Sequence, residues 1–251
     1  MATRKVIAVF GATGAQGGSV VRAILENKQF AVRALTRDVA RPNAVLLKDL
    51  GAEVVRCDLN DKASVEAALK GVHGAFLVTN FWDDFSKEKE VCQGKVVADV
   101  SKRLGLKHVV FSGLENDLNS FLNSQGFKAL PMGDIPMHGI SVADVGAVVA
   151  SIFNSPEQFL GKAVGLSAEA LTVQQYADVL SKSLGKEVRD AKITPEAYEK
   201  LGFPAAKELA DMCRFYHMKP DRDVKLTHRL NPKVKSFSQF ISENHRALKD
   251  L

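Results

Sequence analysis

A glycine-rich turn near the N-terminus constrains the fold of this chain more than any other feature of the sequence. The apolar run of residues 6–10 is expected to form a strand, and residues 19–25 repeat apolar positions with the helical period. Between them, Gly11, Gly14 and Gly17 follow the spacing G-x-x-G-x-x-G. Glycines in such a turn let backbone N–H groups and the positive end of the helix approach a phosphate. The turn therefore predicts a nucleotide-binding βα unit, with a ligand-free tight turn as the alternative.

Strand and helix patterns alternate through the first 112 residues. The expected strands after the first cover residues 30–36, 52–58, 74–80 and 108–112, and the expected helices cover residues 43–50, 62–69 and 86–104. Regular alternation is typical of a parallel sheet with helices on both faces, which binds ligands at the carboxyl ends of its strands. The predicted fold class is α/β, with a Rossmann-like doubly wound parallel sheet and a smaller C-terminal αβ lobe.

The alternation stops after residue 112. Residues 115–127 are polar and rich in asparagine, and Pro131, Gly133, Pro136 and Gly139 follow closely, which is typical of a loop. Helical patterns return at residues 142–153, 173–184, 194–196, 204–217 and 236–248. We therefore expect a nucleotide-binding domain at residues 1–115, a linker at residues 116–139 and a substrate or interaction lobe at residues 140–251.

The residues after the second predicted strand indicate which nucleotide binds. An NAD site places an acidic side chain there to accept the ribose hydroxyls, whereas an NADP site pairs a 2′-phosphate with arginine. Here the strand ends in Thr36 and is followed by Arg37, with Arg41 close by. Asp38 argues the other way, because its carboxylate could face the ribose. We expect NADP(H) as the cofactor, with NAD as the alternative.

Polar residues also follow the other predicted strands. Asp58 ends the third strand, residues 79–81 end the fourth, and Ser112 ends the fifth. Since the carboxyl ends of parallel strands share one edge of the sheet, these residues would line one crevice. Such residues also form ordinary turns after strands, so the crevice is predicted from the set and not from any one member.

Charge and composition exclude several classes of partner. The net charge is +5, but the basic residues are spread along the chain and form no cluster interleaved with aromatic residues, so we expect no direct binding of nucleic acid. Apolar runs are too short to span a membrane. Cys57, Cys92 and Cys213 lack metal-ligand spacing, which predicts no zinc site and a reducing compartment. The expected location is the cytoplasm, with the nucleus also open.

A short-chain reductase would need a tyrosine as proton donor and a lysine four positions later to lower its pKa. The chain has three tyrosines, Tyr176, Tyr198 and Tyr216, and the residues four positions after them are leucine, glycine and proline. The six histidines are scattered among charged residues, and none is nominated as a general base. The sequence therefore predicts no catalytic residue.

Six segments together resemble one known family. They are residues 9–18, 36–37, 78–82, 110–116, 133–137 and 230–232. In these segments the chain is similar to the NmrA-like family, an atypical branch of the short-chain dehydrogenase/reductase superfamily, and most of all to its animal redox sensors. The resemblance implies an NADP(H)-binding regulator that senses the NADPH/NADP ratio, meets regulatory protein partners and has little or no turnover.

The resemblance and the glycine turn together give the expected site. The cofactor-binding residues are Gly11, Ala12, Thr13, Gly14, Ala15, Gln16, Gly17, Arg37, Asp38, Val39, Ala40, Arg41, Asp58, Leu59, Thr79, Asn80 and Phe81. Relatives carry a lysine near Cys92, so one cofactor contact is in doubt. They also carry a further helix and a sixth strand where this chain has only residues 116–133, as if an internal segment were missing.

Three functions follow as hypotheses. The first is a non-catalytic NADP(H) sensor, the second an NADPH-dependent reductase of quinone-like acceptors, and the third a truncated interaction protein with impaired cofactor binding. A homodimer is left open, and no membrane partner is expected.

Overall fold

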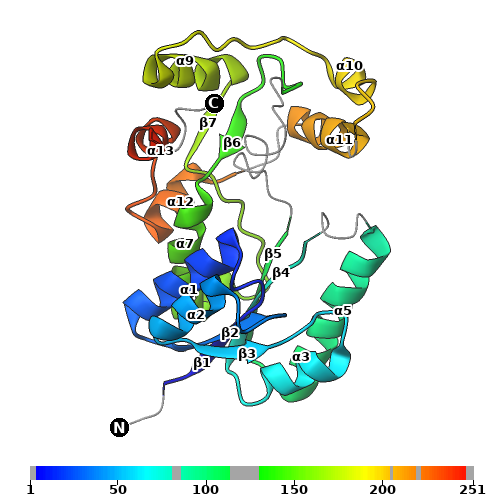
Figure 1. The fold of residues 1–251 in the computed structure, drawn as a ribbon, viewed down its shortest axis with the longest axis vertical. Coiled ribbons are helices and arrows are strands. Elements are labelled where there is room, and N and C mark those ends of the chain that lie inside the picture. Colours follow the sequence, from blue (N-terminus) through cyan, green and yellow to red (C-terminus); the bar gives the residue numbers. More distant parts are fainter. Residues whose placement is uncertain (1–3, 81–85, 114–129, 204–205, 219–221, 247–251) are drawn as a thin grey trace. The chain divides into compact units, whose positions relative to one another are not determined.

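The computed structural model of the chain describes residues 4–80, 86–113, 130–203, 206–218 and 222–246. The chain divides into two compact units (Figure 1). The first consists of Met1–Glu115 with Val142–Lys162, and the second of Asn116–Ser141 with Ala163–Leu251. Most of the expected linker, residues 116–129, lies outside the described residues, as does Phe81 of the expected site.

The first unit is built on a parallel sheet. Its strands are β1 (Val6–Val9), β2 (Ala31–Thr36), β3 (Glu53–Arg56), β4 (Gly74–Val78) and β5 (His108–Ser112). Their order in space is β3-β2-β1-β4-β5, and every neighbouring pair is parallel. This order reverses direction between β1 and β4, which is the switch point where doubly wound sheets bind ligands. The predicted Rossmann-like α/β class is confirmed.

Helices connect and cover these strands. They are α1 (Ala15–Asn27), α2 (Pro42–Asp49), α3 (Lys62–Leu69), α5 (Lys87–Leu104), α7 (Val142–Asn154) and α8 (Pro156–Phe159). The first turns of α3 and α5 are capped by Asp61 and Ser86, whose side chains accept backbone N–H groups. Helices α3 and α5 pack on each other over a core that includes Phe10, Leu69 and Val97.

Helix α7 belongs to the first unit, although sequence analysis assigned residues 140–251 as a whole to the C-terminal lobe. It packs against α1 at Gly146, where an added Cβ would lie 2.2 Å from the carbonyl oxygen of Ser19. This approach of two backbones is a tertiary contact, and no local pattern in residues 142–153 distinguishes the core that the helix joins. The unit boundary therefore differs from the expected one.

The second unit contains a small antiparallel sheet and several helices. The strands are β6 (Met137–Gly139) and β7 (Glu169–Leu171), and the helices are α9 (Val173–Leu184), α10 (Pro195–Glu199), α11 (Ala206–His217), α12 (Val224–Leu230) and α13 (Phe237–Asn244). Thr172 and Ser236 begin α9 and α13 with capping boxes. Met132, Met137 and Tyr176 share one buried cluster with Cys213 and Tyr216 of α11.

Candidate nucleotide site

The glycine turn between β1 and α1 has the conformation that its spacing predicts. Gly11 has a φ of +60°, which residues with a side chain rarely adopt. A Cβ on Gly17 would lie 2.3 Å from the carbonyl oxygen of Gly11, so only glycine allows the first turn of α1 to approach the end of β1. The N–H of Gly14 donates to the same carbonyl at 2.9 Å. The backbone therefore turns tightly at the sheet edge and leads directly into the first turn of α1.

The N-terminus of α1 is open to an anion. Its N-cap, Gly14, has no side chain to accept a hydrogen bond from the first turn, and that turn contains no acidic residue. The first N–H groups of a helix have no partner within the helix, and the helix dipole adds about half a positive charge there. The turn thus retains the electrostatic character of a phosphate site.

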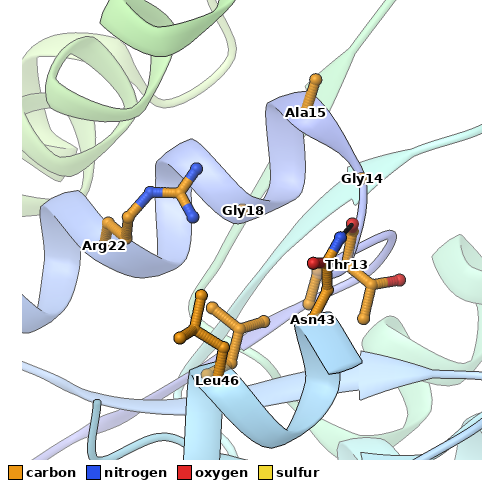
Figure 2. A pocket seen from close by; sticks show the side chains of 9 residues that line it. Thr13, Gly14, Ala15, Gly18, Arg22, Asn43 and Leu46 are labelled. Carbon is orange, nitrogen blue, oxygen red and sulfur yellow. Dashed lines mark hydrogen bonds between the residues drawn. The ribbon is translucent and has the colours of Figure 1, made fainter. Parts of the chain in front are cut away.

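A pocket of about 180 Å³ lies beside this turn, between α1 and α2 (Figure 2). Its lining residues are Ala12, Thr13, Gly14, Ala15, Gly18, Arg22, Asn43, Leu46 and Leu47. The amide nitrogen of Asn43 donates to the carbonyl oxygen of Thr13 at 3.2 Å, which joins the start of α2 to the glycine turn. None of these lining residues is acidic, so the charge of the pocket is set by Arg22 and by the helix ends.

Arg22 is a site residue that sequence analysis missed. Its guanidinium lies along α1 beside Gly18 (Figure 2), where an added Cβ would be 3.3 Å from one of the terminal nitrogens. The side chain is exposed, and no carboxylate pairs with it among the described residues. Gly14, Gly18 and Arg22 are spaced four residues apart and share one helix face, which is the signal that could have identified it.

The loop after β2 carries the residues expected to select the nucleotide. Arg37, Asp38, Val39, Ala40 and Arg41 are all exposed. The carboxylate of Asp38 accepts the N–H of Ala40 at 2.9 Å and lies 3.9 Å from Nε of Arg41. Buried Thr36 accepts the N–H of Asp38 on its hydroxyl at 3.3 Å. The turn thus orients the Asp38 carboxylate, whose side chain stays 53% exposed.

The loop after β3 is also held by its own residues. Asp58 accepts the backbone N–H of Asn60 at 2.9 Å and its side-chain amide at 3.2 Å. The N–H of Asp58 donates to the hydroxyl of Ser64 at 3.0 Å, and half-buried Leu59 packs against the core of the first unit. These contacts fix the shape of the turn after β3.

The polar side chain of Thr79, at the end of β4, is hydrogen-bonded within the protein. The hydroxyl of Thr79 donates to a carboxylate oxygen of Glu90 in α5 at 2.7 Å. Asn80 is exposed. The Thr79–Glu90 bond joins the strand end to the following helix, so this residue already has a structural partner.

The end of β5 is joined to the glycine turn. The hydroxyl of Ser112 donates to the side-chain oxygen of Gln16 at 2.9 Å, across 96 positions of sequence. Gln16 lies in the first turn of α1, and the two residues occupy neighbouring parts of the expected crevice. This bond places two polar residues together that were predicted separately.

The three tyrosines lie in the cores of the second unit. Tyr198 is 1% exposed, and burial raises the pKa of its phenol to about 12. Burial likewise raises the pKa of Tyr176, whose hydroxyl is 3.4 Å from the carbonyl oxygen of Met137. Tyr216 is buried in the same cluster as Tyr176. Each tyrosine therefore has a packing role, in agreement with the lack of a tyrosine–lysine pair.

Two of the three cysteines are buried, and the third is exposed. Burial raises the pKa of Cys57 and of Cys213 to about 11, so both thiols stay protonated at neutral pH. Cys92 is exposed on α5. Within the described ranges, no three His, Cys, Asp or Glu side chains gather as metal ligands, and no helix is long and apolar enough to cross a membrane.

Comparison with known sequences identifies relatives across almost the whole chain. A model of the NmrA-like family matches residues 3–128 and 122–241. The NmrA-like family domain-containing protein 1 of Rattus norvegicus is 32% identical over 225 residues, which cover 90% of this chain and 88% of the rat protein. An NmrA-like family domain-containing oxidoreductase of Aspergillus campestris is 27% identical, with 86% and 83% of the two chains covered.

Solved structures share the fold. NmrA, a negative transcriptional regulator solved in complex with NADP, superposes with a TM-score of 0.77 at 18% identity, covering 99% of this chain and 98% of its own. The NADPH-dependent quinone oxidoreductase QOR2 of Escherichia coli, solved with NADPH, gives a TM-score of 0.73 at 21% identity, covering 96% and 99%. At these identities the likeness concerns the fold.

Proposed function

We propose that this chain, which belongs to the NmrA-like family, binds NADP(H) at its glycine turn and acts as a regulator that responds to the cofactor. The observation that carries the proposal is the pocket beside the turn. There an uncapped helix N-terminus and an arginine that pairs with no carboxylate of the described residues lie together, and none of the lining residues is acidic. Such a site favours a phosphate.

The residues present fit the phosphate groups of the cofactor. Gly17 cannot carry a side chain without striking Gly11, and the first turn of α1, which has no side-chain cap, begins directly at the glycine turn. Arg22 and Arg37 supply the cations that a 2′-phosphate requires, from α1 and from the loop after β2. When bound, the nicotinamide group would supply the capacity to accept or donate a hydride.

A regulatory role is favoured over turnover because the protein offers no proton donor of the short-chain reductase type. The tyrosines are buried in the second unit, and none precedes a lysine by four positions. A regulator needs different affinities for the cofactor in two conformations, since only that difference can shift their populations. The proposed output is a surface presented to regulatory protein partners, in the cytoplasm or the nucleus.

The second candidate is an NADPH-dependent reductase of quinone-like acceptors. It is favoured by the names of two similar proteins, the oxidoreductase of Aspergillus campestris and the quinone oxidoreductase of Escherichia coli. In such a reaction the hydride would pass directly to the acceptor, and solvent would supply the proton. This candidate differs from the regulator in one measurable property, which is consumption of NADPH.

The third candidate is an interaction protein whose cofactor binding is impaired by a missing internal segment. Two observations support the absence of a segment that other members of the family carry. The family model matches in two pieces that overlap at residues 122–128, and the described part of the main sheet ends at β5 without a sixth strand. The segment would have supplied part of the nicotinamide side of the site.

A titration of the pure protein with NADPH, followed by cofactor fluorescence, tests the proposal first. Saturable binding that is tighter for NADPH than for NADH supports either cofactor-dependent function, and absence of binding up to millimolar cofactor leaves only the third candidate. NADPH consumption with a panel of quinones and aldehydes then separates the first two. Steady turnover would replace the regulator with the reductase.

A further inference from the structure

The outer edge of β5 is a prominent feature that the nucleotide site leaves unexplained. β5 ends the main sheet and, as a strand, pairs only with β4 among the described residues. Two of its side chains are large, apolar and exposed, Val109 at 39% and Phe111 at 58%. Edge strands of soluble proteins are normally protected by lysine, proline or inward charges. Residues 108–112 contain no lysine, arginine, acidic residue or proline.

The peptide groups of β5 alternate in direction, and those of Val109 and Phe111 point outward. The N–H of Phe10 donates to the carbonyl of Phe76 at 2.9 Å, so Phe76 faces β1 and its neighbours in β4, Ala75 and Leu77, face β5. In a parallel pair of strands, two residues that lie opposite each other do not both face the neighbouring strand. When one directs its N–H and C=O groups toward that strand, the other directs its groups away.

The register then fixes the direction of the β5 groups. Val109 lies opposite Ala75 and Phe111 opposite Leu77, so both direct their N–H and C=O groups away from β4. In agreement, a Cβ on Gly74 would lie 2.5 Å from the carbonyl oxygen of His108, which faces β4. The outer edge therefore presents two complete donor and acceptor pairs.

We propose that β5 pairs antiparallel with β5 of a second copy of this chain, about a twofold axis through Val110. In this register Val109 lies opposite Phe111 of the second copy, and Phe111 opposite its Val109. Both are hydrogen-bonded pairs, so the outward peptide groups of the two strands satisfy one another. The two sheets become one continuous sheet.

The side chains suit this register on both faces. Val109 and Phe111 project to the same face, where each β-branched residue meets an aromatic one, a favourable cross-strand combination. Val110 meets its own copy on the opposite face, and His108 meets Ser112. Burial lowers the pKa of His108, so this residue is neutral at pH 7. The strand pair therefore brings no like charges together. For this reason the edge of β5 is suited to a second copy of this chain.

Sedimentation of the full chain over a wide concentration range tests the proposal. The wild-type protein is expected to dimerise, and Phe111→Lys is expected to be monomeric, because it places two charges beside the paired strands. Leu160→Lys is the matched control, since Leu160 is 57% exposed and lies outside β5. A wild-type monomer at all concentrations, or a dimer of Phe111→Lys as stable as wild type, would overturn the proposal.

Disulfide trapping tests the register and does not depend on the stability of Phe111→Lys. In a Cys92→Ser background, Val110→Cys should cross-link two copies on mild oxidation, because a non-hydrogen-bonded pair has a Cα separation of about 4.5 Å, within the range of disulfides. Val109→Cys should not, because the two copies of Val109 would be diagonal neighbours more than about 7 Å apart. Equal cross-linking of both variants, or of neither, would contradict the twofold axis at Val110.

Discussion

The two halves of the sheet's carboxyl edge use their polar groups differently. In the β1–β2 half, the first turn of α1 has no cap and Arg22 has no carboxylate partner among the described residues. In the β4–β5 half, Thr79 is bonded to Glu90 and Ser112 to Gln16. In the β1–β2 half, the helix N-terminus and Arg22 can still contact a ligand. In the β4–β5 half, Thr79 and Ser112 are already hydrogen-bonded within the protein.

The difference indicates where binding energy comes from. Groups that have no partner in the free protein gain most from a ligand, whereas groups that are already paired must break one bond to form another. We therefore expect the β1–β2 half to dominate affinity for NADPH and the β4–β5 half to contribute little. The predictions below test that contrast, beginning with the largest effect.

Substitution of Gly17 by valine should abolish NADPH binding. The new side chain would strike the carbonyl of Gly11, forcing α1 away from the turn and costing about 1–3 kcal/mol of stability as an overpacking defect. NADPH affinity should fall more than about a hundredfold, or about 2.7 kcal/mol. Fluorescence titration and thermal unfolding measure the two effects. The control is Gly94→Ala in α5, where an added Cβ meets nothing within 4 Å and should stabilise the helix by about 1 kcal/mol.

Replacement of Arg22 by alanine should weaken NADPH by about tenfold or more while leaving NADH nearly unchanged. A charge-assisted bond to a phosphate contributes about 1.5–3 kcal/mol, and only NADPH carries the 2′-phosphate. Arg37→Ala should act in the same direction. The matched control is Arg103→Ala, because Arg103 already pairs with Glu66 on the surface at 2.6 Å. Equal losses for the two cofactors would show that Arg22 does not contact the 2′-phosphate.

Sequence patterns predicted the first half better than the second because its features are local. The spacing of Gly11, Gly14 and Gly17 encodes the turn directly, since each glycine answers a backbone requirement within seven residues. Arg22 lies on the same helix face but was missed, because an exposed arginine is ordinary unless a pocket is known beside it. The bond between Ser112 and Gln16 joins residues 96 positions apart, and no local pattern specifies such a contact.

The placement of α7 shows the same limit on a larger scale. Its amphipathic pattern predicted the helix at residues 142–153, and the structure has it at Val142–Asn154. The pattern states that one face is buried but not against which partner. In the structure the partner is α1, which Gly146 allows to approach closely at Ser19. The two small residues are far apart in sequence, so no local pattern reveals this contact.

We also expect the stability of the protein to depend on pH, because two histidines lie at the amino ends of β4 and β5. Burial lowers the pKa values of His108 and His73 below 6.5, and the positive charges of Lys5 and Lys107 lower that of His73 further. Because the unfolded chain then binds protons more readily, stability is full above the unfolded pKa and falls as the pH drops toward the folded values. Melting temperature should decrease by a few degrees between about pH 7.5 and pH 5.5, since about 1 kcal/mol corresponds to about 2–4 °C.

The variant His108→Phe tests whether His108 causes the decrease in melting temperature at low pH. His108 packs edge to face on Phe153 with ring centroids 5.1 Å apart, so His108→Phe keeps an aromatic ring and removes the titrating group. The difference between the wild-type and variant melting curves should grow as the pH falls. A constant difference across the pH range would show that His108 is not responsible.

Removal of the Ser112 hydroxyl should have the smallest effect. Ser112→Ala deletes one hydrogen bond to Gln16, with a net contribution of about 0.5–1.5 kcal/mol to stability. Since this bond lies within the protein, NADPH and NADH should both lose no more than a few-fold in affinity, and by the same factor. Thr79→Val, which deletes the bond to Glu90, provides the parallel measurement on β4. If either variant lost as much NADPH affinity as Arg22→Ala, the β4–β5 half would be making direct cofactor contacts, and the proposed division between the two halves would be wrong.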